Sequence, residues 1–218
     1  MSQHSVFITG ATGYMGSALI PVLLARGHSV RALAREASAQ HLPAGVETVI
    51  GDALVPATFA HAIAPADTLV HLIGTPSPSP AKAASFQAVD LPSVDAALAA
   101  SLAAGIRHFV YLSVAQPAPV MQAYVAVRQA SEARIRASGI PATFLRPWYV
   151  LGPRHRWPYL LVPFYAIFER LPPTRERAQR LGLVTLRQMV NALVASIERG
   201  SDGVRVIDVP GIRAAAAA

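Results

Sequence analysis

Short runs of β-branched and aromatic residues alternate along the chain with longer stretches whose apolar residues recur at helical spacing. The strands predicted from these runs are 5–9, 29–35, 46–50, 68–73, 107–112, 141–146 and 204–209. The glycines expected to end helices are Gly27, Gly105, Gly139 and Gly200. Thr185 and Gln188 have the spacing of a capping box and predict a helix over 186–199. Strands that alternate with helices predict an α/β fold, with a mostly parallel sheet covered on both faces.

Two stretches interrupt this alternation. Residues 74–80 are rich in Pro and Ser and are expected to form a loop at the carboxyl end of the fourth strand, where α/β sheets bind ligands. Residues 147–180 are rich in Pro, Arg and aromatic residues and are expected to cover the substrate side. The predicted organisation is a core over 1–153, a cap over 154–182, a C-terminal helix and strand over 183–213, and an uninformative alanine tail over 214–218.

The composition is that of a soluble globular protein. Of the 218 residues, 53% are hydrophobic and 14% are charged, which is enough to bury a sizeable core. No uninterrupted apolar run reaches the roughly 18 residues of a transmembrane helix. The N-terminus lacks a basic segment and a cleavage site, so the expected location is the cytoplasm. The absence of cysteine excludes disulfides, thiolate nucleophiles and thiolate metal sites.

The chain is basic, with a net charge of +7, and its 19 basic residues are all arginines except Lys82. A lysine-dependent mechanism would therefore have to use Lys82. Positive charge suits a nucleic acid, an anionic membrane or an anionic small molecule. Because no run of five basic residues and no nucleic-acid motif occurs, we expect a small-molecule substrate and no nucleic-acid partner.

Three glycines follow the first strand at the spacing G-x-x-G-x-x-G. Gly10 permits a sharp exit from the strand, and Gly13 lets the backbone approach a pyrophosphate. Gly16 lets the next helix pack close to the sheet, and the N–H groups at the start of that helix favour an anion. The pattern predicts a dinucleotide site. The other residues assigned to this turn are Thr12, Tyr14 and Met15.

Several motifs together resemble the atypical or extended short-chain dehydrogenase/reductases. They are TGATGYMG at 9–16, Gly51-Asp52, YLSV at 111–114, Tyr124-x-x-x-Arg128 and LRPWYVLGP at 145–153. The most similar group is the compact NAD(P)-binding one that includes NmrA-like regulators, the complex I 39 kDa subunit and the small biliverdin and flavin reductases. The resemblance covers residues 5–153 and, more loosely, 183–209. It implies a Rossmann-type doubly wound parallel sheet with a small C-terminal cap and a nicotinamide cofactor.

The end of the second strand is where such a fold selects its cofactor, because a carboxylate there binds the ribose 2′-OH of NAD(H) and an Arg binds the 2′-phosphate of NADP(H). Both types are present, as Arg35 and Glu36, and Arg31 can add charge. We expect Arg35 to bind the phosphate, so that NADP(H) is favoured over NAD(H), and Glu36 to begin a helix. A carboxylate role for Glu36 and a merely solvated Arg35 are the alternatives. The remaining cofactor contacts implied by the resemblance are Asp52 and Ala53 at the adenine, Gly74, and Pro147 at the nicotinamide end.

In this family a Tyr is the general acid/base, a Ser after the fifth strand orients the substrate oxygen, and a Lys one turn beyond the Tyr holds the ribose. Tyr124 and Ser113 match, whereas position 128 is Arg. The spacing of four places Arg128 on the helix face of Tyr124, but Arg does not replace Lys at a site shaped for a compact ammonium. One interpretation is an NADP(H)-dependent oxidoreductase that uses Tyr124, Ser113 and Arg128 on a small hydrophobic or anionic carbonyl or conjugated substrate. The alternative is a non-catalytic NAD(P)-binding sensor, regulator or assembly factor.

The remaining polar candidates have simpler explanations. Arg146 is expected to tie the sheet edge to the cap rather than to bind substrate. His71 and His155 lack metal-ligand spacing, so no metal site is predicted. The basic and aromatic cap residues between 154 and 168 suit a flat or hydrophobic substrate with an anionic group. They also suit a membrane surface or a partner, although a lid on the domain's own core is the simpler interpretation, and the oligomeric state stays open.

Overall fold

A seven-stranded sheet runs through the molecule in the order β3-β2-β1-β4-β5-β6-β9, and all its neighbouring strands are parallel. The computed structural model describes residues 3–76, 78–153, 168 and 175–215. The sheet strands are β1 (Ser5–Thr9), β2 (Ser29–Ala34), β3 (Glu47–Ile50), β4 (Thr68–His71), β5 (His108–Leu112), β6 (Ala142–Leu145) and β9 (Val204–Ile207). All seven predicted strands are present, β1 with the predicted bounds and the others one or two residues shorter, and the Rossmann-type α/β fold is confirmed.

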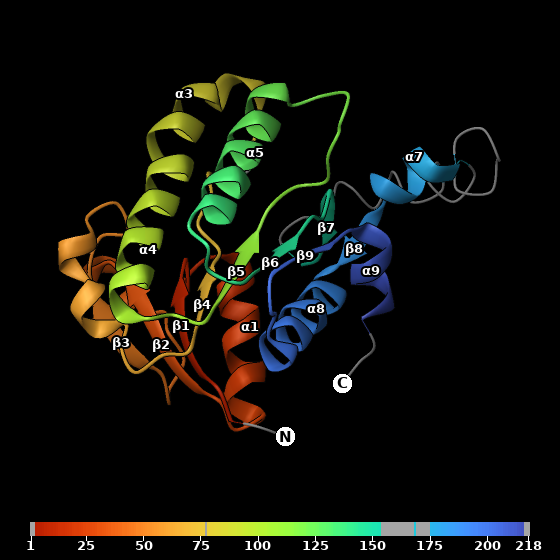
Figure 1. Ribbon diagram of the computed structural model, residues 1–218. Coiled ribbons are helices and arrows are strands. Elements are labelled where there is room, and N and C mark those ends of the chain that lie inside the picture. The colour runs from red at the N-terminus through yellow and green to blue at the C-terminus, as the bar shows by residue number, and fades with distance from the viewer. Residues whose placement is uncertain (1–2, 77, 154–167, 169–174, 216–218) are drawn as a thin grey trace.

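Helices cover both faces of this sheet (Figure 1). The α-helices longer than one turn are α1 (Tyr14–Ala25), α2 (Glu36–Ala39), α4 (Leu91–Ala104), α5 (Gln122–Ala137), α7 (Arg175–Arg180), α8 (Leu186–Arg199) and α9 (Val209–Ala214). The hydrophobic core cluster that contains α1 and α8 lies on one face of the sheet, and the cluster that contains α4 and α5 lies on the other. The shorter turns are η1 (Pro56–Thr58), η2 (Ala60–Ala62), η3 (Pro80–Lys82) and α3 (Ala83–Ser85). No helix in the described ranges has the length and apolar content to cross a bilayer.

β1 shows how the sequence positions this sheet. Val6 and Ile8 pack in the cluster beneath α1 and α8, whereas Phe7 packs in the cluster beneath α4. Successive side chains of a strand point to opposite faces, so a strand whose consecutive inner residues are all apolar belongs in the interior of a two-sided sheet. The glycine turn that follows β1 therefore emerges at the carboxyl edge between β2 and β4.

The C-terminal segment packs on the core through α8 and β9. α8 begins at a capping box, in which the Thr185 side chain accepts from the Gln188 N–H. β9 extends the sheet beyond β6. A second sheet, formed by β7 (Tyr149–Leu151) and β8 (Leu183–Thr185), was not predicted. α9 includes Ala214, the first residue of the alanine tail, and most of the predicted cap lies outside the described residues.

A π-helical turn, η4 (Phe86–Asp90), precedes α4. The side chains of Phe86 and Asp90 are both fully buried. Such turns insert one extra residue into a helix and often occur at functional sites. The turn aims a carboxylate into the interior at the carboxyl edge of the sheet.

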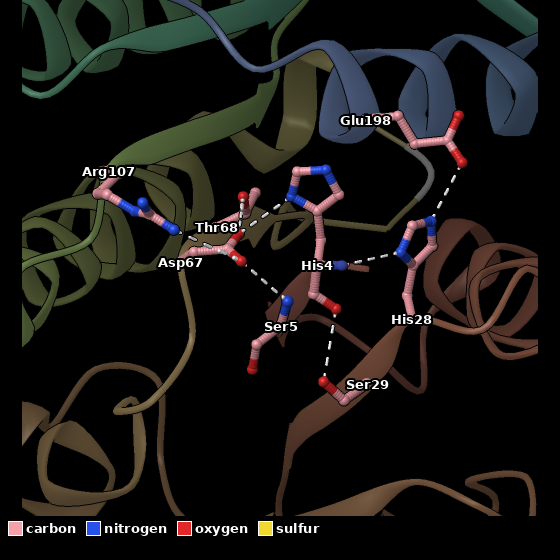
Figure 2. Close-up of polar contacts among 8 residues, drawn as sticks. All are labelled: His4, Ser5, His28, Ser29, Asp67, Thr68, Arg107 and Glu198. Atoms are coloured by element: carbon pink, nitrogen blue, oxygen red, sulfur yellow. Dashed lines mark hydrogen bonds and ion pairs between the residues drawn. The ribbon is translucent and has the colours of Figure 1, made fainter. Parts of the chain in front are cut away.

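Polar contacts hold the opposite, amino edge of the sheet (Figure 2). Asp67 accepts from the Ser5 N–H at 3.0 Å and from the Thr68 hydroxyl at 2.7 Å. Nε2 of His28 lies 3.1 Å from Glu198 Oε1, which joins the start of β2 to α8. These contacts hold the starts of the strands at the amino edge, whereas the glycine turn lies at the carboxyl edge.

Besides His28, two histidines of the described residues are buried, His71 and His108. Nδ1 of His71 is 2.9 Å from the Thr9 hydroxyl, and Nε2 of His108 is 2.9 Å from the Thr143 hydroxyl. Burial, assisted by the charge of Arg128, lowers the pKa of His71 to about 3. Burial chiefly lowers the pKa of His108 to about 4. Both rings are therefore neutral at pH 7.

Because both rings are buried and neutral, we expect the free energy of unfolding to fall at acid pH. In the unfolded chain a His ionises near pH 6.5, so below that pH the unfolded state takes up protons that the folded state does not. The free energy of unfolding should fall by about 2 kcal/mol for each ring between pH 7 and pH 5. Urea titrations of wild type and His71→Gln at the two pH values measure this, with the exposed His61→Gln as control. An equal drop in wild type and His71→Gln would contradict the assignment.

Candidate functional site

A cleft of about 470 Å³ opens at the carboxyl edge of the sheet. It lies where β1 neighbours both β2 and β4, the position at which the strand order reverses and ligands bind in folds of this type. Of the predicted cofactor residues, those that line the cleft are Gly10, Thr12, Arg35, Asp52, Ala53 and Gly74. The structure thus brings together these six residues, which are distant in the sequence.

The glycine turn is tightly packed on its inner side. Gly10 has a φ of +76°, and a Cβ there would lie 2.9 Å from the carbonyl carbon of Leu72. A Cβ on Gly16 would overlap the backbone of Ala11. Gly13 is exposed and begins α1 without a capping side chain from the described residues, so its neighbouring N–H groups are open to an anion.

Five predicted cofactor residues do not line the cleft, among them Gly13 and Gly16. Met15 is buried in the core beneath α1. The Tyr14 hydroxyl packs against Gly152, where a Cβ would overlap it. Pro147 is buried, and its carbonyl accepts from the Ala115 N–H at 2.8 Å. Their predicted cofactor contacts stay predictions.

The end of β2 carries Arg35 and Glu36 as expected. Arg35 is exposed at the cleft and precedes α2, and Glu36 is the first residue of that helix. The Arg31 contribution to this charge is corrected, because Arg31 lies in the first half of β2 and its Nε donates to Glu47 at 2.7 Å. Asp52 lines the cleft, and its Oδ1 also accepts from the Leu54 N–H at 2.9 Å.

Arg128 is buried beneath the cleft with an exposed fraction of 3%. Nη2 forms an ion pair with Asp90 at 3.1 Å. Nη1 donates to the Tyr111 hydroxyl at 2.9 Å and to the carbonyls of Leu112 and Ile73 at 3.1 and 3.3 Å. One guanidinium therefore joins the ends of β4 and β5 to the turn before α4.

The charge of this guanidinium is retained despite its burial. Burial by itself lowers the pKa of Arg128, but the interactions with Tyr111, Tyr124 and Asp90 outweigh it and raise the pKa. The guanidinium lies 5.0 Å from the centre of the Tyr124 ring, as the spacing of four residues predicts. It also fills the space below Gly74, where a Cβ would overlap Nη2.

Ser113 is also buried, but its hydroxyl donates to Glu132 Oε1 at 2.6 Å. Arg146 Nε donates to the same oxygen at 2.9 Å. Arg146 thus ties the end of β6 to α5. These contacts give Ser113 a partner within the fold, and its role toward a substrate oxygen stays a prediction.

Two acidic residues of this region were not predicted, Asp90 and Glu132. Both are buried and paired with arginines, Asp90 with Arg128 and Glu132 with Arg146. For Asp90 the available signal was its position between Val89 and Leu91, because a charge at a buried helical position is normally paired. Glu132 follows Ser131 and lacks such flanking residues. Within the described ranges no three His, Asp or Glu side chains gather as metal ligands, and His155 lies outside those ranges.

Residues 10–156 match a family model described as NAD(P)H-binding. Over 150 residues, 68% of this chain and 47% of the relative, the chain is 31% identical to the ceramide reductase of Caulobacter vibrioides. Over 109 residues, 49% of this chain and 32% of the relative, it is 36% identical to the 4-hydroxy-2-methyl-3-oxo-4-farnesyl-3,4-dihydroquinoline-1-oxide ketoreductase of Stigmatella aurantiaca. The chain therefore spans half or less of the length of these curated relatives.

The fold is similar to the crystal structure of the Bordetella bronchiseptica enzyme WbmH in complex with NAD⁺. The TM-score is 0.71 at 21% identity, with 95% of this chain and 76% of that chain covered. At this identity the similarity concerns the fold.

Gly13 provides a test of the cleft. Gly13→Trp places a bulky ring where the open N–H groups of α1 would meet a phosphate, so dinucleotide affinity should fall at least about 100-fold, the scale of losing charge-assisted hydrogen bonds. Calorimetric titration with NADPH and NADH measures it. Gly203→Trp, on a glycine with no atom near its Cβ position, is the control. Undiminished binding in Gly13→Trp would contradict this placement.

Proposed function

The chain belongs to the NAD(P)H-binding family, and from that premise we propose that it is an NADP(H)-dependent reductase of an oxo group on a lipophilic substrate. The observation that carries the proposal is the arrangement of Tyr124 over a buried cation that itself lies beneath the cleft wall at Gly74. This arrangement would hold a proton donor and a positive charge next to a dinucleotide-type cleft.

The cleft residues suit a nicotinamide dinucleotide. The open N–H groups at Gly13 would hold the pyrophosphate, and Asp52 and Ala53 the adenine end. Arg35 would bind the 2′-phosphate of NADP(H), since it is exposed and joined to no carboxylate among the described residues. A bound NADPH supplies the hydride.

Tyr124 is proposed as the acid that completes the reduction. Its hydroxyl hydrogen moves to the substrate oxygen as the carbonyl carbon gains the hydride, which leaves an alcohol and a phenolate. The positive charge of Arg128, 5.0 Å from the ring, stabilises that phenolate. Arg128 thus supplies the charge that a lysine supplies in the related enzymes, without the freedom to bind the ribose.

Ser113 is proposed as a second donor to the substrate oxygen. Its hydroxyl hydrogen is directed to Glu132 in this structure, so the role requires the hydroxyl to turn from that carboxylate. Arg146 would still neutralise Glu132 after the change.

The substrate class is inferred from the wall beside Tyr124 and from the relatives. Tyr124, Trp148 and Leu181 pack around an apolar cluster of Val114, Ala118 and Val125. The names of the two curated relatives describe reductases of a ceramide and of a farnesyl quinoline oxide. An apolar wall next to a proton donor suits an oxo group on a long apolar chain.

A non-catalytic sensor is the second candidate. The contacts that favour it are those of Arg128 and Ser113, because both side chains are bonded within the fold. A sensor would bind the dinucleotide in the same cleft and reduce no substrate.

Arg35 should determine the cofactor preference. Arg35→Ala should weaken NADPH binding by about 1.5–3 kcal/mol, the scale of a charge-assisted hydrogen bond, and leave NADH binding nearly unchanged. Calorimetric titration of both cofactors measures the difference, with Arg107→Ala, an exposed arginine at the amino edge, as control. Equal losses for NADPH and NADH would assign Arg35 to general charge.

Tyr124 should determine turnover. Tyr124→Phe keeps the ring above Arg128 and removes the proton donor, so kcat should fall by about 10²–10⁴-fold with unchanged NADPH affinity. Steady-state reduction of long-chain aliphatic ketones measures it. Tyr149→Phe, in the second sheet, is the matched control. Full activity in Tyr124→Phe would refute the proton-donor role, and no turnover by wild type would favour the sensor.

A further inference from the structure

Asp90 is the acidic residue most completely enclosed in the site region, with no exposed surface. Its Oδ2 pairs with Nη2 of Arg128 at 3.1 Å. Its Oδ1 accepts from both the N–H and the hydroxyl of Thr75, each at 2.8 Å. One carboxylate therefore holds two segments at once, and the π-helical turn η4 aims it at them.

The two segments belong to different parts of the site. Thr75 and its neighbour Gly74 line the cleft at the end of β4. Arg128 does not line the cleft, but it belongs to α5 and underlies the ring of Tyr124. Among the residues that the structure describes, the polar link from Thr75 to α5 runs through Asp90 and Arg128.

Stability alone is a weak reason for this arrangement. Burying two charges costs solvation energy that their attraction rarely exceeds, and apolar residues of similar volume often replace a buried ion pair without loss. The Nε of Arg128 adds to this cost, because it is buried with no hydrogen-bond partner among the described residues. The pair also forms a polar link between the cleft and α5, which apolar residues of the same volume could not form.

We propose that Asp90 is a positioning residue that couples the cofactor cleft to the helix that carries Tyr124. The coupling of dinucleotide binding to the Thr75 segment stands on the contacts alone, whereas its effect on turnover rests on the proposed reductase function. A cofactor that orders Gly74 and Thr75 thereby also fixes Asp90, the guanidinium and the ring above it. Conversely, a substitution at Arg128 changes the affinity for the cofactor, although Arg128 does not line the cleft.

The test separates this coupling from simple packing. Arg128→Met leaves the Asp90 carboxylate buried without its partner, and the double variant Asp90→Leu/Arg128→Met replaces the whole pair by apolar residues. Asp95→Leu/Arg134→Met removes an exposed ion pair between the same two helices, α4 and α5, and is the matched control. The readouts are thermal stability, NADPH dissociation constant, amide hydrogen exchange at Thr75, and kcat at saturating NADPH.

If Asp90 couples the cleft to α5, the variants should change thermal stability differently from NADPH affinity and kcat. Arg128→Met should lower the melting temperature and raise Thr75 exchange more than exchange in β1. The double variant should regain most of the melting temperature, while its NADPH dissociation constant stays at least about tenfold higher and its kcat at least about tenfold lower than in wild type, the scale of lost charge-assisted hydrogen bonds. The control pair should match wild type in all four readouts.

A stable double variant with wild-type NADPH affinity and kcat would overturn the proposal and make the pair structural. Should the double variant fail to fold, Asp90→Asn, which keeps the shape and an acceptor for Thr75, replaces it. Asp90→Asn should also weaken NADPH binding and lower kcat, and unchanged values would overturn the proposal. If wild type binds NADPH but reduces no ketone, the reductase function fails, and NADPH affinity and Thr75 exchange alone decide the coupling.

Discussion

The buried ion pair of Arg128 and Asp90 is the contact on which the arrangement of the site depends. Parallel strands bring their carboxyl ends to one edge, but they do not by themselves hold the loops and helices that leave that edge. The guanidinium bonds to the ends of β4 and β5, and the carboxylate bonds to Thr75 in the cleft wall. The cleft and the ring of Tyr124 are consequently parts of one bonded unit.

The fold was predictable because its signals are local. A run such as 5–9, apolar at its three inner positions, is typical of an interior parallel strand, and it forms β1 between β2 and β4. The glycine spacing predicts a turn that only residues without a Cβ fit, and Gly10 and Gly16 are indeed in contact with backbone. Thr185 and Gln188 likewise predict a helix start from four consecutive positions. Each of these inferences needs only neighbours in sequence.

The polar contacts of the site were not predictable in the same way, because their partners are distant in sequence. Arg128 and Asp90 are 38 positions apart, and nothing near either residue indicates the other. The spacing of Tyr124 and Arg128 predicted a shared helix face but not that the guanidinium would turn inward. Arg31 was placed near the cofactor on charge alone, whereas its register opposite Glu47 decides its partner. Long side chains reach several acceptors, and only the packed fold selects among them.

The proposed function is the reduction of a lipophilic ketone by bound NADPH, as opposed to sensing of the nucleotide alone. The most direct measurement is the near-ultraviolet absorbance of NADPH in a single-turnover mixture of wild-type protein, NADPH and a long-chain aliphatic ketone, with the alcohol quantified by mass spectrometry. The account predicts that the absorbance falls and that one alcohol forms for each NADPH consumed. Tight binding of NADPH with unchanged absorbance and no alcohol, across aliphatic ketones of every chain length tried, would contradict it.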